Sequence, residues 1–304
     1  METDPRLEAV YLVYEPDGRL YESVGMLARQ VRKPDILTIY MTVEDDAPED
    51  DPGTEAIREK IRACALGIDN IRFNDVRRSQ FGHGRTRQQA MDESGCEYVM
   101  FITQDAVPYD NSLTLELLRA LDNPDAACAY ARQRAYPDAD DVEKLFRAFN
   151  YPRKSRSKAA ADIGKIGVKA FFNSDVCCMY RHSVFDAVGG FDRELKFNED
   201  SIFAYNALMH GYTVEYVAEA VVWHSHNVDL KKLFARSADI ARSQLEHPDI
   251  FENVSSAHEG IRFFTKGAGY FIRNMRPLSA VRLFIYCAVR YAGYFKGKHF
   301  GSLR

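Results

Sequence analysis

One aspartate follows directly after the most strand-like segment of the chain. Asp105 lies in the run Ile102-Thr103-Gln104-Asp105-Ala106, at the end of the apolar segment Glu97–Thr103. A carboxylate at this point can hold Mg²⁺ or Mn²⁺, and the bound cation would neutralise a diphosphate. An aspartate in a turn or at a helix N-cap has the same appearance in a sequence. Taken alone, the position supports both interpretations equally.

Two further groups could take part in chemistry. Glu199-Asp200 opens a predicted helix, where a carboxylate either caps the helix or acts as a general base aimed into a cleft. His224 and His226 are separated by one residue at the end of a strand-like run, so both side chains lie on one face. The pair could bind a metal, although a histidine is more often a hydrogen-bonded structural residue.

A small glycine-rich loop, Phe81-Gly82-His83-Gly84-Arg85-Thr86-Arg87, precedes a predicted helix. Its backbone amides and arginines could contact a phosphate or a nucleotide base. The loop lacks the spacing of a G-x-G-x-x-G dinucleotide fingerprint and the Lys-Ser/Thr pair of a P-loop. It therefore indicates anion binding only together with the other motifs.

The first part of the chain alternates strand-like with helix-like segments. Apolar, β-branched and aromatic runs predict strands, and the segments between them have helical spacing. The predicted strands are Glu8–Tyr14, Asp35–Val43, Asn70–Asn74 and Glu97–Thr103, and the predicted helices are residues 20–31, Thr54–Ala65 with Thr54 as N-cap, and Arg85–Glu93. Strands separated by helices of this size form a parallel sheet with helices on both faces.

Ligands of such sheets bind outside the carboxyl ends of the strands. Four acidic residues come just after predicted strands, namely Glu15, Asp45, Asp46 and Asp105. We therefore expect the binding site at the edge of the sheet where these residues lie.

The second part of the chain is less regular. Residues 132–170 are polar, with two prolines and a basic run, and they predict a long irregular insertion such as a binding loop, a lid or a disordered segment. The predicted elements that follow are strands at Asp175–Tyr180, Thr213–Val217 and Ala220–His224 and a helix at Ser201–His210. From Asp229 onward the chain is predicted to be helical.

The composition is that of a globular protein. The 304 residues are 46% hydrophobic and 28% charged, which excludes a disordered chain, a collagen-like chain and a small disulfide-stapled domain. The net charge of −4 hides a division, because residues 261–304 contain nine Lys/Arg and no Asp/Glu, whereas residues 1–260 contain 31 basic and 44 acidic residues. The basic segment also holds ten Phe/Tyr, a mixture that suits either an anionic membrane surface or packing on the rest of the protein.

The sequence also carries information about location. Six cysteines without a C-x-x-C pair and an N-terminus without a signal peptide are typical of a cytoplasmic protein with reduced thiols. Residues 278–295 are the most apolar stretch, but Arg282 and Arg290 interrupt it, so a membrane-spanning helix is not expected. We expect peripheral attachment to the inner face of the cell membrane through residues 261–304. Nucleic acid is not expected as a partner, because the remaining body is acidic and lacks a recognised binding motif.

The order of the motifs resembles family 2 glycosyltransferases with the GT-A fold, and more narrowly their bacterial rhamnosyltransferase branch. The matching motifs are FGHGRTR at 81–87, TQDA at 103–106, GGFD at 189–192, ED at 199–200 and HSH at 224–226. The resemblance implies a Rossmann-like α/β domain with a mostly parallel sheet over residues 1–227. A helical, basic and aromatic C-terminal extension would follow over residues 228–304.

The resemblance also implies roles for individual residues. Asp105 matches the last acid of the family's D-x-D metal motif, in which Thr103 replaces the first acid. Asp200 matches the catalytic base. His224, which lies 24 residues further on, matches a metal-binding histidine, with His226 as the alternative.

Other matches concern the nucleotide sugar. The positions expected to contact it are Glu15, Asp45 or Asp46, Arg87, Thr103 and Gln104. Arg87 stands at the arginine of an A-R-N motif, in which Gln88 replaces the asparagine. The usual D-x-S-x-D loop after the second strand is altered to Val43-Glu44-Asp45-Asp46.

The function implied is inverting transfer of L-rhamnose from dTDP-β-L-rhamnose to a hydroxyl of a glycan or lipid-linked oligosaccharide, with Mg²⁺ or Mn²⁺ as cofactor. Another nucleotide sugar, of the UDP-hexose or galactofuranose type, and a non-catalytic nucleotide-sugar-binding module are the alternatives. A dinucleotide oxidoreductase fits less well, because no glycine fingerprint follows the first strand. A helical membrane-interaction protein would leave the strand-end acids unexplained.

Overall fold

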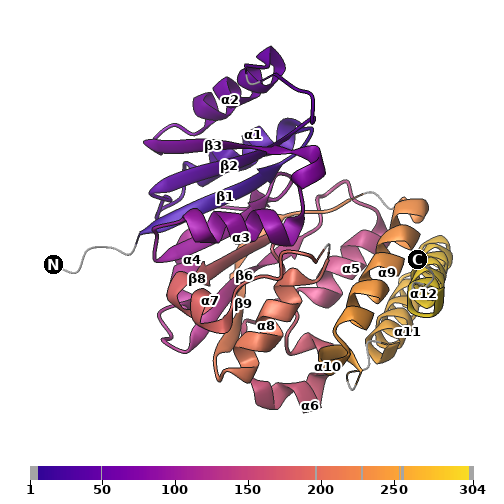
Figure 1. Ribbon diagram of the computed structural model, residues 1–304. Coiled ribbons are helices and arrows are strands. Elements are labelled where there is room, and N and C mark those ends of the chain that lie inside the picture. The colour runs from indigo at the N-terminus through magenta and orange to yellow at the C-terminus, as the bar shows by residue number, and fades with distance from the viewer. Residues whose placement is uncertain are drawn as a thin grey trace.

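Four parallel strands form the first half of the sheet. The computed structural model describes residues 6–300 apart from 49, 196, 227, 228, 253, 255 and 256, and it describes only the backbone of residues 257 and 258. The strands and the main helices that join them are β1 (Leu7–Val13), α1 (Gly18–Leu27), β2 (Ile36–Val43), α2 (Pro52–Cys64), β3 (Asn70–Arg77), α3 (His83–Glu93) and β4 (Tyr98–Thr103). The strand order is β3-β2-β1-β4, and Figure 1 labels the first three side by side. Every pair is parallel, as the sequence predicted. The order reverses at β1, which is where open α/β sheets bind ligands.

The second half of the sheet is mixed. Its strands are β5 (Val107–Pro108), β6 (Ala126–Arg134), β7 (Arg156–Lys158), β8 (Cys177–Arg181) and β9 (Thr213–Trp223). β8 runs antiparallel between β4 and β6, β9 is parallel to β6, and the short strands β5 and β7 are antiparallel to β9. The two strands predicted around residues 213–224 are one strand, because a shift of register opposite Ala131 and Arg132 lets the ladder continue.

Helices cover both faces of the sheet. One apolar cluster lies under α1, α2 and α4 (Leu113–Ala120), with Leu20, Ile61 and Leu117 among its buried residues. A second lies under α3, α7 (His182–Val188) and α8 (Glu199–Met209), where Phe185 and Phe203 stack at a ring-centroid distance of 5.0 Å. The chain is thus an α/β protein whose mostly parallel sheet is covered by helices on both faces.

Aspartate side chains fix the starts of four helices. Asp17, Asp51, Asp140 and Asp229 each accept a hydrogen bond from a backbone N–H of the first turn. This corrects the prediction that Thr54 caps α2, since the N–H of Thr54 donates to Asp51 Oδ2 at 2.7 Å. An aspartate followed by Pro52 is the stronger start signal, because proline at the first helical position needs no hydrogen-bond acceptor.

The predicted irregular insertion at residues 132–170 is largely ordered into short elements. They are the end of β6, α5 (Asp141–Asn150), β7, η2 (Ala160–Asp162), α6 (Ile163–Ile166) and η3 (Gly167–Lys169). The prediction was wrong because the polar composition concealed α5. Val142 of this helix is buried together with residues more than a hundred positions later in the chain.

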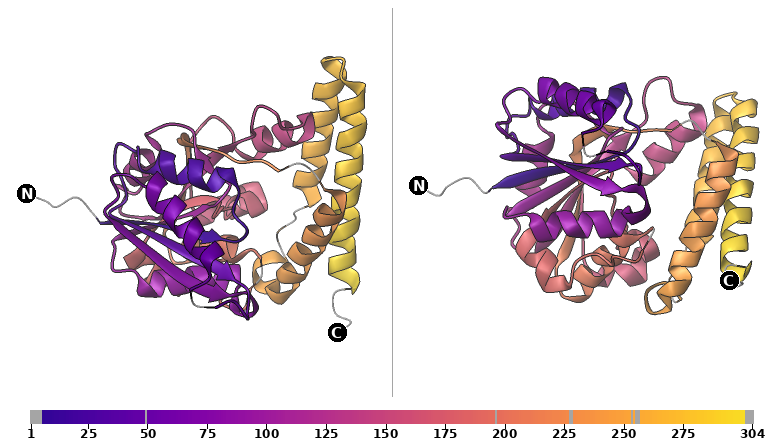
Figure 2. Two further views of the ribbon diagram at one scale, coloured as in Figure 1. Left: turned by 90° about the horizontal axis from the view of Figure 1, so that it is seen from above. Right: turned by 45° about the horizontal axis from the view of Figure 1, so that its top comes forward.

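The C-terminal helices form a layer beside the α/β domain. They are α9 (Leu230–Glu246), α10 (Pro248–Phe251), α11 (Ala257–Arg273) and α12 (Pro277–Phe300). α11 and α12 form a long hairpin at one side of the molecule, with α9 and α5 between it and the sheet (Figures 1 and 2). Phe263, Phe271, Leu283 and Tyr286 of the hairpin are buried in one apolar cluster with Val142. In the part of the chain that the structure describes, no helix is both long and apolar enough to cross a bilayer.

Candidate active site

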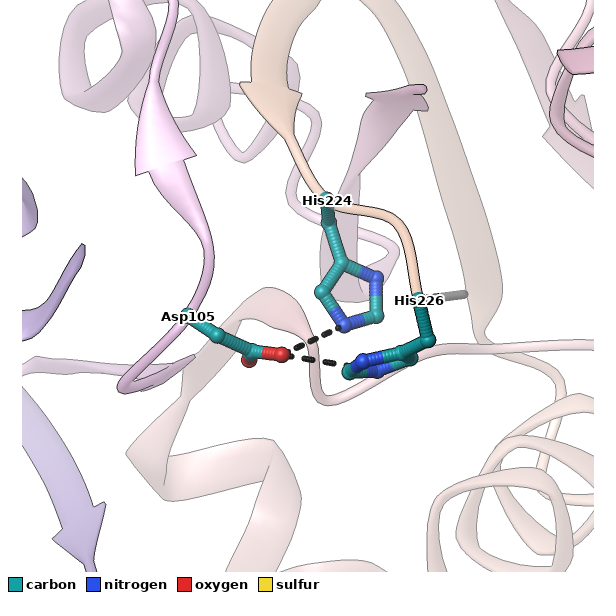
Figure 3. A group of neighbouring side chains, drawn as sticks. All are labelled: Asp105, His224 and His226. Carbon is teal, nitrogen blue, oxygen red and sulfur yellow. Dashed lines mark ion pairs between the residues drawn. The ribbon is translucent and has the colours of Figure 1, made fainter. Parts of the chain in front are cut away.

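Three side chains converge at the carboxyl ends of β4 and β9. Asp105 follows β4, and His224 and His226 follow β9. Asp105 Oδ2 lies 3.4 Å from Nε2 of each histidine, and the two imidazole rings stand edge to face with centroids 4.7 Å apart (Figure 3). One ligand atom from each residue falls within 4.8 Å of the others. The structure therefore brings together the sequence-predicted metal residues, and it includes both histidines.

The tautomer of His224 follows from its buried neighbours. Gln133 of β6 has its Oε1 atom 2.9 Å from His224 Nδ1. The same oxygen accepts a hydrogen bond from Arg147 Nη1 on α5, and because a guanidinium only donates, this atom of the amide must be the oxygen. His224 Nδ1 must then be the donor. In the neutral ring, the lone pair is left on Nε2, which faces Asp105.

The protonation states also favour a cation. Burial lowers the pKa of His224 to about 4, so the ring is neutral near pH 7. Burial alone would raise the pKa of Asp105. At acid pH, where the histidines are protonated, the hydrogen bond from His224, the positive charges of His224 and His226 and the Thr103 hydroxyl bring that pKa below the ordinary value, so Asp105 is already ionised when the rings become neutral. A carboxylate and two neutral imidazoles are the protonation states that bind a metal. The residues therefore fit a divalent cation.

A second charged cluster surrounds Asp200 at the start of α8. Arg87 of α3 is buried, with its Nη1 atom on Glu199 Oε1 and its Nε atom 3.3 Å from Asp175 Oδ2. Asp200 accepts hydrogen bonds from the backbone N–H groups of Asp175, at 3.3 Å, and Ser201, at 2.7 Å. One guanidinium thus faces two acids directly and lies close to a third. These contacts fix the orientation of the Asp200 carboxylate.

Burial raises the pKa values in this cluster. It raises the pKa of Asp175 to about 6 and that of Glu199 to about 8, although Arg87 opposes both shifts. Burial also raises the pKa of Asp200, again against the influence of Arg87. A carboxylate with a raised pKa is a stronger base than one in water, so Asp200 is suited to accepting a proton.

Hydrogen bonds connect the two clusters. Gln133, which orients His224, also donates from Nε2 to Ser174 Oγ at 2.9 Å. The next residue, Asp175, donates its backbone N–H to Asp200. The candidate metal ligands and the candidate base are therefore linked at the edge of the sheet through the buried residues Gln133, Ser174 and Asp175.

A pocket of about 520 Å³ opens beyond the ends of β1 and β2. Glu15 and Asp46 line it, and Glu15 has φ 44°, a left-handed conformation that a non-glycine residue rarely adopts. Asp45 turns instead to the Ser79 hydroxyl, at 2.7 Å, in the 3₁₀ turn η1 (Arg78–Gln80). Gln104 is also occupied, since its amide forms hydrogen bonds with both backbone groups of Tyr14.

Comparison with known proteins identifies the family. A family model, "Glycosyl transferase family 2", matches residues 19–189. This chain belongs to glycosyl transferase family 2.

Individual relatives agree with this assignment. The O-antigen chain rhamnosyltransferase RfbN of Salmonella typhimurium (strain LT2) is 33% identical over 241 residues, which are 79% of this chain and 76% of that protein. The O-antigen chain rhamnosyltransferase WbaN of Salmonella anatum is 33% identical over 229 residues, covering 74% and 72%. The mannosyltransferase PcManGT from Pyrobaculum calidifontis, solved in complex with GDP-Man and Mn²⁺, shares the fold with a TM-score of 0.66 at 12% identity, covering 98% of this chain and 88% of that chain.

In this glycosyltransferase the glycine-rich motif at 81–87 makes protein contacts. A Cβ at Gly84 would collide with the carbonyl oxygen of Asp192, so α3 approaches the GGFD segment closely. Gln88 Oε1 accepts a hydrogen bond from the N–H of Phe191 at 2.6 Å. The structure thus joins two motifs that are separate in the sequence, and α3 holds the segment that leads to Asp200.

Gln133, Arg147 and Asp175 are residues of this network that the sequence did not reveal. All three are buried polar side chains. Their sequence signal was weak, because Gln133 and Arg147 lie in the segment interpreted as an irregular insertion and Asp175 stands at the predicted start of a strand. An internal glutamine and arginine among apolar neighbours could have drawn attention, since buried polar groups need partners.

Proposed function

We propose that this glycosyltransferase transfers L-rhamnose from dTDP-β-L-rhamnose to a hydroxyl of a glycan or lipid-linked oligosaccharide, with inversion, during cell-surface polysaccharide synthesis. The choice of sugar rests on the 33% identity to two O-antigen chain rhamnosyltransferases. One observation supports the chemistry, namely that the candidate metal ligands Asp105, His224 and His226 and the oriented Asp200 carboxylate are linked at the sheet edge through Gln133, Ser174 and Asp175. We place the reaction in the cytoplasm, at the inner face of the cell membrane.

Asp200 is the proposed general base. Its carboxylate takes the proton of the acceptor hydroxyl while that oxygen attacks the anomeric carbon from the face opposite the diphosphate. The new bond to the acceptor oxygen forms as the bond to the diphosphate oxygen breaks, and a single displacement inverts the configuration. Burial makes Asp200 more basic, and the N–H groups of Asp175 and Ser201 hold it in place.

Asp105, His224 and His226 would hold a divalent cation. When bound, the cation supplies positive charge against the charge that develops on the leaving diphosphate. Two imidazoles and one carboxylate suit Mn²⁺ better than Mg²⁺, which prefers oxygen ligands. His224 presents its lone pair because Gln133 fixes its tautomer.

The remaining proposed contacts concern the donor. Glu15 and Asp46 line the pocket at the ends of β1 and β2 and would contact the nucleoside, with Asp45 beside them. Thr103 and Gln104 directly precede Asp105, and Gln104 also forms hydrogen bonds with the backbone of Tyr14, which lines the pocket. Arg87 would act on the donor indirectly, since Asp175 and Glu199 already engage its guanidinium.

A donor panel tests the proposal. dTDP-rhamnose, UDP-glucose, UDP-galactofuranose and GDP-mannose would be compared for release of nucleoside diphosphate with Mn²⁺, with Mg²⁺ and with EDTA. Preferred turnover of dTDP-β-L-rhamnose, loss of activity in EDTA and an α-linked product by NMR are expected. Turnover of another donor would redirect the substrate assignment, and donor binding without turnover in any acceptor mixture would favour the non-catalytic module.

Replacement of the base gives the sharpest test of mechanism. Asp200→Asn should reduce kcat by about 10²–10⁴-fold while the Kd for the donor, measured by calorimetry, stays nearly the same. Asp186→Asn is the matched control, because the Asp186 side chain is exposed on α7. If Asp200→Asn retains wild-type turnover, Asp200 is not the base.

A further inference from the structure

The outer face of α12 is apolar along most of its length. Exposed residues recur there with spacings of three, four and seven, as Leu278, Val281, Phe284, Ile285, Ala288, Tyr291, Ala292 and Phe295. The exposed fraction is 60% for Phe284 and 68% for Tyr291. At 1.5 Å per residue the stripe is about 26 Å long. A continuous apolar stripe of this length on a water-facing helix is typical of an interaction surface.

The hairpin turn extends this stripe. Met275, between α11 and α12, is 87% exposed and adopts a left-handed backbone conformation with φ 55°. Ile272 on the last turn of α11 is 65% exposed. We call Ile272, Met275 and the α12 stripe the outer hairpin face.

α12 is held to the protein chiefly by its opposite side, while Phe284 on the outer hairpin face contacts Phe264 of α11 at a ring-centroid distance of 6.2 Å. The opposite side of α12 carries Leu283 and Tyr286, which are buried in the cluster with α5 and α11. Gly293 and Gly297 bring the same side against α9, where an added Cβ would meet backbone of Phe234 and Ala238. Both views in Figure 2 place α12 at the margin of the molecule, away from the sheet. The hairpin is therefore held by one side and leaves the other uncovered.

The charge around the outer hairpin face selects its partner. Residues 261–304 carry nine Lys/Arg and no Asp/Glu, and Arg273, Arg282 and Lys298 are among those exposed. Two copies of this chain that met through the face would bring these positive charges together, which disfavours a dimer. A surface with negative headgroups over an apolar layer satisfies both features, because basic side chains gain about 1 kcal/mol each near anionic lipid and the apolar stripe leaves water.

We infer that the outer hairpin face lies flat on an anionic lipid bilayer, with Phe284 and Tyr291 in the headgroup region and the basic residues beside them. This inference concerns only where the proposed rhamnosyl transfer takes place. Lipid binding is measured without donor or acceptor, so its failure and the failure of the proposed function are distinguishable.

Vesicle sedimentation with the full chain tests the inference. The double variant Phe284→Ser, Tyr291→Ser would be compared with wild type on phosphatidylcholine vesicles with and without about one third phosphatidylglycerol. The control is Leu66→Ser, since Leu66 is 77% exposed and lies after α2, outside the hairpin. We expect wild type and control to bind the anionic vesicles, with binding weakened by raised salt. The double variant should lose at least about tenfold in affinity, with unchanged circular dichroism and unchanged donor turnover on a water-soluble acceptor.

Three results would overturn the inference. They are equal binding of wild type to both kinds of vesicle, full binding by the double variant, and a lipid-independent dimer in light scattering that the double variant dissociates. The last result would assign the face to a second copy of the chain.

Discussion

The polar residues around Asp105 and Asp200 and the C-terminal hairpin differ in which kind of side chain they bury. The network around Asp105 and Asp200 consists of charged and polar groups that the fold buries and pairs, with Gln133 and Arg147 as internal partners. The hairpin leaves apolar side chains exposed on one face. Paired buried polar groups hold their side chains in fixed positions, because the loss of a hydrogen-bond partner lowers the stability of the fold. Exposed apolar side chains stabilise a contact only when a partner covers them and removes them from water. This difference supports the proposals of a chemical role for the first region and a docking role for the second.

Helix α5 lies between these two regions. One side of it carries Arg147 and Glu143, which form an ion pair at 2.7 Å. Arg147 also donates a hydrogen bond to Gln133. Another side carries Val142, Leu145 and Phe146, which pack on α11 and α12. The hairpin thus supports the helix that orients a candidate metal ligand. In addition, Ser243 of α9 accepts a hydrogen bond from Asn198, directly before Glu199 and Asp200.

The largest effect in this comparison is expected from the amide that orients His224. Gln133→Met removes the acceptor for His224 Nδ1–H and for Arg147, so the affinity for Mn²⁺ should fall by about 10- to 100-fold. Gln133→Glu keeps that acceptor and should retain most of the affinity, because the hydroxyls of Tyr151 and Ser174 can turn to donate. Electron paramagnetic resonance titration of free Mn²⁺ measures this without turnover.

The two variants distinguish positioning from packing. A merely structural role predicts that the apolar, similarly sized methionine is tolerated and that the buried glutamate is not. If Gln133→Met binds Mn²⁺ as the wild type does, the hydrogen bond does not position His224. Thermal unfolding of both variants would show how much of each change comes from stability.

Local patterns were sufficient to predict the parallel half of the fold. β1, β2 and β4 are apolar runs that predict strands without knowledge of their neighbours. The acids after them lie at one edge of the sheet because parallel strands have their carboxyl ends at the same edge. Asp105, His224 and Asp200 were found in this way and through the resemblance. The structure brings Asp105, His224 and His226 together and orients the Asp200 carboxylate, while the roles of these residues stay predictions.

Long-range partners explain what the sequence did not show. The sequence of α5 is mostly polar, and its apolar residues are buried only because α11 and α12 pack on them. Arg87 looks like a nucleotide contact in the sequence, yet Asp175 and Glu199, about a hundred residues away, enclose it. Neither fact is visible in a local window, because buried ion pairs depend on which strands and helices become neighbours.

A smaller effect is expected where the hairpin joins the rest of the protein. Gly293→Ala places a Cβ against the carbonyl oxygen of Phe234 on α9, so α12 must move outward, and the free energy of unfolding should fall by about 1–3 kcal/mol. Gly269→Ala on α11 is the control, since a Cβ there meets nothing within 4 Å. Alanine is the better helix former, so this variant should gain up to about 1 kcal/mol. Chemical denaturation measures both, and equal values would mean that close α9–α12 contact is not needed.

The smallest effect concerns pH and the acids around Arg87. The pKa of Glu199 is raised to about 8 and that of Asp175 to about 6 by burial, whereas both ionise near pH 4 in an unfolded chain. Between those values the folded state holds more protons than the unfolded state, so stability falls as pH rises. We expect Tm to be about 2–6 °C lower at pH 8.5 than at pH 5.5. Glu199→Gln cannot ionise and should flatten this dependence, whereas Glu194→Gln, at an exposed position, should leave it unchanged. A wild-type Tm that rises over this range would mean that Arg87 keeps Asp175 and Glu199 ionised throughout. The cluster would then consist of permanent ion pairs that hold these side chains in place over the whole pH range.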